Sequence, residues 1–224
     1  MLTAIPKGSY LKSGLIMIYH VLSPIFKVNH KIEQPRDFIK FIRGNPNDLS
    51  DMFRGSDIRN ISYMIEKIFD LSNIEYADRM FKDARFNIIQ LKMPKVRSAK
   101  NMFEGATGAR LSPCDFRKLV DGTEMFKFTY IDYVDEQEMS QVEIAKGMFE
   151  GSRLKYFDQF KFKSLKSVDS MFRGTSVYRI DSSGFDNVQT YKNIFDSATV
   201  KCKLNGKLKK IAEEYGFEKI AKNK

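Results

Sequence analysis

The segment Val168–Thr175, which reads VDSMFRGT, contains a Met-Phe pair that recurs through the chain at nearly constant spacing. A degenerate seventh copy, Ile194-Phe195, follows six intact ones. Successive copies lie 28, 22, 23, 23, 23 and 23 residues apart. The intact pairs begin at Met52, Met80, Met102, Met125, Met148 and Met171. A fixed period in this range is typical of a solenoid, in which one supersecondary unit is repeated along an axis.

Apolar residues recur at fixed positions around each pair. Counted from the methionine as zero, positions −6, −3, 0 and +1 are apolar in most copies, which predicts one stripe on a helix of two to three turns. Glycine at +3 in four copies predicts a left-handed residue that ends this helix. Phe128 occupies that position in the fourth copy and predicts a different ending there. Apolar residues at +6 and +9 predict a short strand that faces the core.

These elements predict an α/β solenoid of about seven strand–turn–helix repeats. Strands lie about 4.8 Å apart and packed helices roughly 8–10 Å apart, so such a stack would curve with its strands on the concave face. The expected organisation is an N-terminal cap over 1–44, the solenoid over 45–204 and a C-terminal capping helix over 205–224, all in one continuous domain. The Met-Phe pairs then belong to the core.

The repeat resembles that of a known family, the BspA-type (bacterial surface protein) leucine-rich repeats. In that family a Met-Phe-x-Gly-small segment recurs after a stretch similar to Asn-Val-x-x-Met. The best matches here are Phe185–Phe195 and Val168–Thr175, and the resemblance covers about Asn45–Ala198. It implies a leucine-rich-repeat-like, right-handed coil and a role in protein binding or adhesion, in cell-surface proteins and in some phages and protists. The family brings no catalytic residues. The chain has no Trp and no visible signal sequence or anchor, which favours a small intracellular or phage-borne adaptor.

The net charge of +10 is concentrated at the two ends. Residues 1–50 carry seven Lys or Arg against three acids, and residues 201–224 carry eight Lys against three Glu. This distribution weakens the case for a nucleic-acid-binding stripe along the whole solenoid. The only cysteines, Cys114 and Cys202, lie about four repeats apart and are expected to stay unpaired, which favours a reducing, cytoplasmic location over a virion or cell surface. The apolar run Leu15–Leu22 is too short to span a membrane.

Motifs for catalysis are absent from the sequence. His20 and His30 are the only histidines, and neither lies in a nucleophile motif. The two cysteines and two histidines do not have zinc-ligand spacing, and no phosphate-binding glycine motif is present. We therefore expect no enzymatic activity, no cofactor and no metal site.

The strand residues that flank the inward positions are the candidates for binding. Tyr and Arg are enriched there, and these two residue types dominate interaction hot spots. The sequence thus favours a non-enzymatic protein–protein interaction module, for example a phage or bacterial adaptor or inhibitor, whose concave strand face holds a partner with an acidic surface. Two alternatives stay open: a nucleic-acid-binding protein that uses the basic caps and the Tyr/Arg ladder, and a surface or virion adhesin. The oligomeric state is left open. The candidate binding residues are Arg59, Arg85, Arg110, Tyr133, Lys155, Tyr156, Tyr178 and Arg179.

Overall fold

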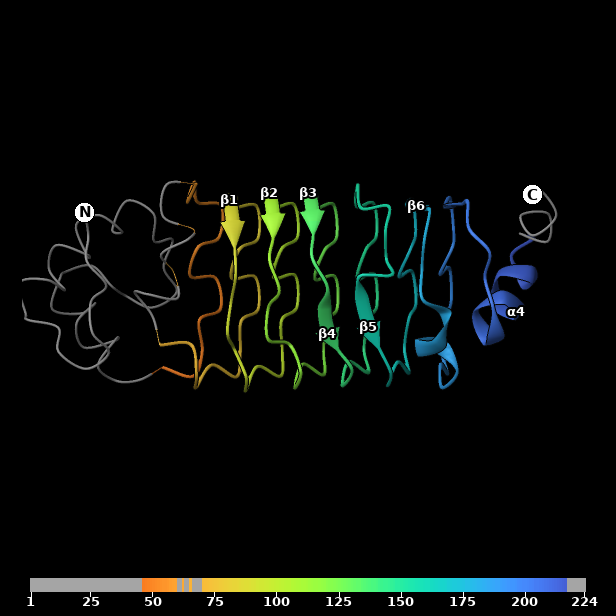
Figure 1. The fold of residues 1–224 in the computed structure, drawn as a ribbon, viewed down its shortest axis with the longest axis horizontal. Helices are drawn as coiled ribbons and strands as arrows, with labels where there is room; N and C mark the ends of the chain where they lie inside the picture. Colours follow the sequence, from red (N-terminus) through yellow and green to blue (C-terminus); the bar gives the residue numbers. More distant parts are fainter. Residues whose placement is uncertain (1–45, 60–61, 63–64, 66–69, 217–224) are drawn as a thin grey trace, which may run out of the picture.

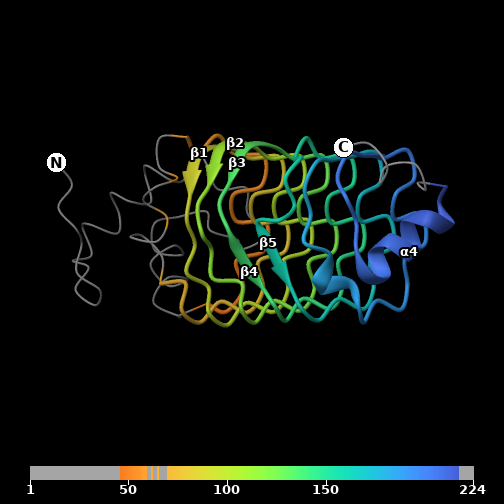
Figure 2. The ribbon, with the colours of Figure 1, turned by 45° about the vertical axis from the view of Figure 1, so that its right-hand side comes forward.

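The chain forms a β-solenoid whose coils stand side by side along one axis (Figure 1). The structure is a computed structural model that describes residues 46–59, 62, 65 and 70–216. Figure 2 shows the same stack turned so that the coils lie one behind another. The expected N-terminal cap over 1–44, with His20, His30 and the apolar run Leu15–Leu22, lies outside the described residues. The solenoid itself is confirmed.

Short parallel strands join successive coils. A three-stranded sheet has the order β1-β2-β3, with Arg85 beside Thr107 and Thr107 beside Tyr130. Two further parallel pairs, β4-β5 and β6-β7, and a series of isolated parallel bridges continue the contact between coils. The strands are β1 (Arg85–Ile89), β2 (Thr107–Leu111), β3 (Tyr130–Val134), β4 (Gln137–Met139), β5 (Phe160–Phe162), β6 (Ser176–Val177) and β7 (Thr199–Val200). The remaining elements are the 3-10 helix η2 (Ser182–Phe185) and the α-helix α4 (Gly206–Glu214).

The Met-Phe segments are successive turns, so the expected strand–turn–helix repeats are wrong. Within Val168–Thr175 every second N–H donates to the carbonyl three residues earlier, as from Met171 to Val168 at 3.1 Å. The N–H groups between them donate to the next coil, as from Ser170 to Lys192 at 2.8 Å. A helix would satisfy all its N–H groups within its own segment. Sharing them with the neighbouring coil instead ties the stack together.

Two backbone positions in every copy have positive φ. Position −1 ranges from 54° to 62° and position +3 from 52° to 66°. Each is the third residue of a turn, where type II turns require φ > 0. The left-handed residue expected at +3 is therefore confirmed, and Phe128 adopts it as well with φ of 52°, which contradicts the different ending expected there. A residue with positive φ at −1 is incompatible with a continuous right-handed helix around the Met-Phe pair.

The core is organised around a continuous stack of seven phenylalanines. Successive ring centroids lie 5.4 to 5.8 Å apart, with interplanar angles of 6° to 13°. All seven rings are buried. Offset stacking in this range of distances is favourable for aromatic pairs. The rings belong to Phe53, Phe81, Phe103, Phe126, Phe149, Phe172 and Phe195.

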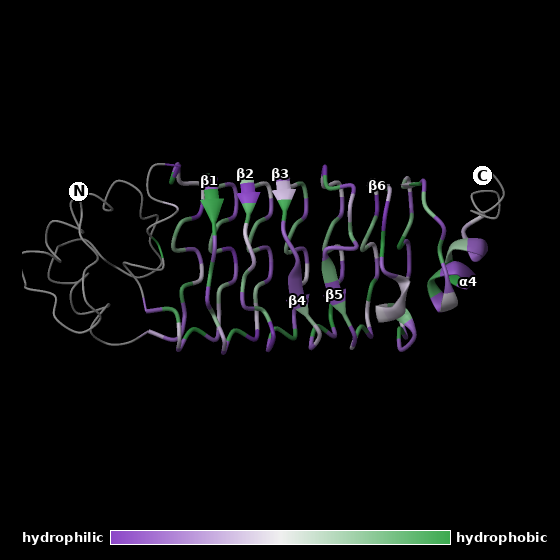
Figure 3. Cartoon of the chain, viewed as in Figure 1, coloured by the Kyte–Doolittle hydropathy of each residue, from purple (hydrophilic) through white to green (hydrophobic). Residues whose placement is uncertain are grey.

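The other inward positions are also buried as the sequence predicts, although the turns replace the helix. Positions 0 and +6 are buried in every copy, and position −6 is buried in every copy after the first, where it is the half-buried Pro46. Apolar and polar residues accordingly alternate along each coil (Figure 3). Because strands and turns, rather than helices, line the coil, the spacing argument for a curved stack no longer applies, and the expected concave face is replaced by one face of an unbent row of coils (Figure 1).

Helix α4 lies at the end of the stack (Figure 1) and buries Leu208, Ile211 and Ala212. The hydroxyl of Tyr215, just after it, accepts a hydrogen bond from the N–H of Asn193 at 2.6 Å and donates to the carbonyl of Tyr191 at 3.1 Å. An amphipathic helix is thus confirmed over Gly206–Glu214; its role as a cap stays a prediction. Across the described part of the chain, no helix is long and apolar enough to cross a membrane.

Two glycines in the core give a test of the packing. A Cβ at Gly108 would overlap three atoms of the buried Phe86 ring, whereas a Cβ at Gly122 would meet chiefly the terminal methyl of Met148, which can rotate away. Gly108→Ala should therefore lower the free energy of unfolding by about 1–3 kcal/mol. Gly122→Ala should change it by no more than about 1 kcal/mol, because alanine occupies this position in other coils, such as Ala99 and Ala145.

Urea denaturation of the two variants measures this difference. Equal losses for both variants would contradict the packing of Phe86 over Gly108.

Candidate binding groove

The strand face presents two exposed residues between each pair of buried ones. Strands β1 and β2 both show the order exposed, buried, exposed, exposed, buried, and β3 differs only in a half-buried last residue. The parallel register then aligns equivalent residues of successive coils, as for Arg110 beside Tyr133. Side chains that occur once per coil in the sequence therefore form columns on this face.

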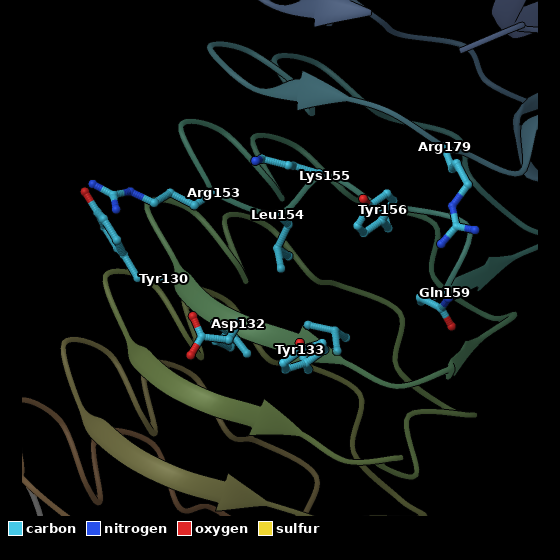
Figure 4. Close-up of a pocket in the computed structure, with 11 residues that line it drawn as sticks. Tyr130, Asp132, Tyr133, Arg153, Leu154, Lys155, Tyr156, Gln159 and Arg179 are labelled. Carbon is cyan, nitrogen blue, oxygen red and sulfur yellow. The ribbon is translucent and has the colours of Figure 1, made fainter. Parts of the chain in front are cut away.

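These columns enclose a shallow groove of about 840 Å³ on β3 and the next two coils. Its floor includes the buried Ile131 and Leu154. Figure 4 shows Tyr130 with Arg153 at one side of the groove, Tyr156 and Arg179 at the other, and Tyr133 between them. The remaining lining residues are Asp132, Val134, Lys155 and Gln159.

Stacked pairs of arginine and tyrosine mark both sides of the groove. The Arg153 guanidinium lies 4.2 Å from the centre of the Tyr130 ring, and that of Arg179 lies 4.6 Å from the centre of the Tyr156 ring. Such cation–π contacts are worth about 0.5–1 kcal/mol at exposed sites. They hold both guanidinium groups over rings that are themselves exposed. Tyr133 is 73% exposed and Tyr156 is 50% exposed.

Tyr178 extends this arrangement next to the groove. Its ring makes an edge contact with Tyr156 at a centroid distance of 6.3 Å. The ammonium groups of Lys201 and Lys155 lie 4.8 and 5.6 Å from its ring centre, and Lys201 donates to its hydroxyl at 3.0 Å. That hydrogen bond, together with the positive charge of Lys201, holds the pKa of Tyr178 below its ordinary value. Aromatic and cationic side chains thus alternate across three coils.

The eight residues predicted from the sequence separate into two groups. Four of them line the groove: Tyr133, Lys155, Tyr156 and Arg179. Tyr178 adjoins it through Tyr156. The other three, Arg59, Arg85 and Arg110, lie outside it.

Two of these outer arginines are already bound to carboxylates. Arg59 makes a two-pronged contact with Asp57, and Arg110 contacts Asp135 through Nε at 2.9 Å and Nη2 at 3.0 Å. Arg85 is exposed on β1, two strands away from Tyr130. None of the three therefore contributes to the groove.

The pair of Tyr130 and Arg153 was missed in the sequence. Both occupy position +5, which is the first residue of β3 in the case of Tyr130, and they are 23 residues apart. The same spacing that placed Tyr133 and Tyr156 in one column could have identified this second column. Asp132 and Gln159 carried no comparable repeat signal.

The turn segments differ from the groove because their charges are compensated. Ion pairs join successive coils there, including Arg79–Asp51 at 2.7 Å, Lys82–Glu104 at 2.6 Å and Arg173–Asp196 at 3.1 Å. Within the groove, Arg179 approaches Asp158 at 3.5 Å. Neither Arg153 nor Lys155 has an ion-pair partner among the described residues. Uncompensated positive charge is thus found beside exposed aromatic rings.

Other sites have less support in the part of the chain that the structure describes. No cluster of three His, Cys, Asp or Glu side chains there could hold a metal ion. Cys114 is buried, Cys202 is half-buried, and neither is in a disulfide. Burial raises the pKa of the Cys202 thiol. The groove is therefore the candidate site.

The comparisons with known proteins identify a family without a known activity. No curated protein and no solved structure matches the chain. The family described as "Mycoplasma protein of unknown function, DUF285" matches it twice, over residues 21–115 and 109–211. These two matches together cover most of the sequence and overlap over residues 109–115, at the end of β2. The chain therefore belongs to this family of unknown function, DUF285.

Proposed function

We propose that the chain is a non-enzymatic binding module that holds a protein partner in the groove on β3 and the two coils after it. The observation that carries this proposal is the pair of Arg–Tyr stacks, one at each side of the groove. Tyr and Arg are the residues that contribute most to protein interfaces. The stacking also fixes both side chains before a partner arrives, which reduces the entropy lost on binding.

The lining of the groove supports contact through side chains. The groove opens beside β3, the last strand of the three-stranded sheet. The following coil bonds just before β3, where the N–H of Arg153 donates to the carbonyl of Thr129 at 3.0 Å, and the side chains of both coils then line the groove. A protein-binding role agrees with what the resemblance to BspA-type repeats implies; that family assignment and the cytoplasmic location stay predictions.

A double substitution in the groove tests this role. Tyr156→Ala with Arg179→Ala removes one Arg–Tyr stack and should reduce partner capture by at least about tenfold, since hot-spot residues each contribute more than about 1 kcal/mol. The measurement is affinity capture from native lysate with quantitative mass spectrometry. Both side chains are exposed, so thermal unfolding should show a nearly unchanged midpoint.

The matched control is Lys146→Ala, which removes an exposed cation of the turn segments near Asp169. Proteins retained by the wild type and this control but lost by the double variant support the proposal. An identical set of captured proteins for all three would refute the assignment of the groove.

A further inference from the structure

We infer that the groove binds an extended acidic peptide segment in which two carboxylates, three residues apart, flank a bulky apolar side chain. This inference rests on the proposed function and adds the chemistry of the partner. It follows from the charge of the lining, the separation of the two Arg–Tyr stacks and the exposed Tyr133 ring between them.

The charge of the groove selects an anionic ligand. Three cations line it, Arg153, Lys155 and Arg179, against the single carboxylate Asp132. Arg153 and Lys155 lack ion-pair partners among the described residues, and Asp158 contacts Arg179 from outside the lining at 3.5 Å. A guanidinium presents a planar row of donors that fits a carboxylate in a two-pronged contact. Each stacked arginine can therefore receive one carboxylate of the partner.

The separation of the stacks sets the spacing of the two carboxylates. Tyr130 and Tyr156 are 26 residues apart in the chain, which is one period of 23 plus three residues along the coil. Three residues of strand extend roughly 10 Å, and one coil adds about 4.8 Å across, so the two ring positions lie roughly 11 Å apart. Residues i and i+3 of an extended peptide are separated by about the same distance.

An exposed aromatic ring lies between the stacks and favours a bulky apolar side chain between the carboxylates. Ile131 and Leu154 form part of the floor, and the Tyr133 ring stands 73% exposed between the two sides (Figure 4). Covering this ring would bury apolar area at about 25 cal/mol per Å². A ligand with charge alone would leave the ring exposed.

A synthetic peptide can test the inference on the full chain. The probe is a fluorescein-labelled peptide, Gly-Glu-Glu-Leu-Leu-Glu-Glu-Gly, whose inner glutamates are three residues apart, and the readout is fluorescence anisotropy. Arg153→Gln and Arg179→Gln should each weaken binding about fivefold, the effect of losing about 1 kcal/mol from one exposed charge pair. The control Arg54→Gln removes an exposed arginine next to Asp51 in a turn segment and should leave the affinity unchanged.

Three further probes separate the contributions of negative charge, apolar side chains and ligand class to binding. Replacing the glutamates with glutamine, or the leucines with glycine, should weaken binding, and the affinity for the acidic probe should fall with rising salt. Equal binding of the glutamine peptide, or an affinity in both arginine variants that is unchanged from the wild type, would overturn the inference. So would tighter binding of an eight-nucleotide oligo-dT that depends on the same arginines, because a nucleic acid would then be the better occupant.

Failure of the inference differs from failure of the proposed function. If the acidic peptide does not bind while proteins captured from lysate still depend on Tyr156 and Arg179, only the ligand chemistry is wrong. If both peptide binding and capture are independent of these residues, the groove is not the binding site.

Discussion

Replacement of Phe126 by alanine is expected to lower the free energy of unfolding by about 3–5 kcal/mol, the usual cost of deleting a buried phenylalanine. Phe126 lies near the middle of the phenylalanine stack. Its ring centre is 5.5 Å from that of Phe103 and 5.6 Å from that of Phe149, and a tilted contact at 5.3 Å joins it to Phe160. The substitution therefore removes contacts to both adjacent coils and leaves a cavity that the coil spacing cannot close, because strands on the same coils are hydrogen-bonded to each other.

Phe128→Ala is the matched control for this prediction. Phe128 is two residues away, is of the same residue type and is 48% exposed, with its ring beside Gly151 rather than in the stack. Its replacement should change stability by no more than about 0.5 kcal/mol. Urea denaturation of the two variants gives both values. Similar losses at the two positions would show that the stack does not carry the stability assigned to it.

The contrast between these two phenylalanines also shows how much the sequence could predict. The 23-residue period and the apolar positions identified the solenoid and nearly all of its buried residues, because burial requires only that equivalent residues of successive coils face inward. Apolar positions that are three or four residues apart fit a helix. They also fit a series of turns that are closed by hydrogen bonds between residues three apart. The sequence could not separate these two solutions by periodicity alone.

The residue types at position −1 carried the missing signal. Asp51, Asn101 and Asn193 tolerate the left-handed region, and Gly147 adopts it without strain. Arg79 and Glu124 adopt it too, although neither type favours it, so the pattern was concealed in part of the copies. In these copies the hydrogen bonds to neighbouring coils, as from Arg79 to Lys100 at 2.8 Å, impose the conformation that the local sequence does not specify.

The groove was predicted only in part for a related reason. Tyr133, Tyr156 and Arg179 were found because they flank buried strand positions at the repeat spacing. Arg110 satisfies the same criterion, yet its charge is used by Asp135. Asp135 lies in the following coil, 25 residues later, a separation slightly different from the period. An ion pair at such an offset depends on side-chain geometry, which the repeat pattern does not specify.

Ser170 offers a substitution whose sign distinguishes a turn from a helix. It has φ of 56°, and Gly147 occupies the equivalent position one coil earlier with the same φ. In a helix, glycine at this position would cost about 1 kcal/mol. In the turn, Ser170→Gly removes about 1–2 kcal/mol of left-handed strain, against roughly 0.5–1 kcal/mol for the added freedom of the unfolded chain. We therefore expect Ser170→Gly to be neutral or to stabilise the protein by up to about 1 kcal/mol.

Ser170→Pro at the same position should instead cost about 3 kcal/mol or more. Proline requires φ near −65° and has no N–H, so it can neither adopt the left-handed turn nor donate to the carbonyl of Lys192, which now accepts from Ser170 at 2.8 Å. Since the bond joins two coils, we expect its loss to weaken the stack on both sides of the turn. Thermal and urea unfolding of the three proteins should show that the glycine variant is at least as stable as the wild type with serine. The proline variant should be far less stable than both. A clear loss with glycine would contradict the turn, because only a right-handed segment is weakened by that change.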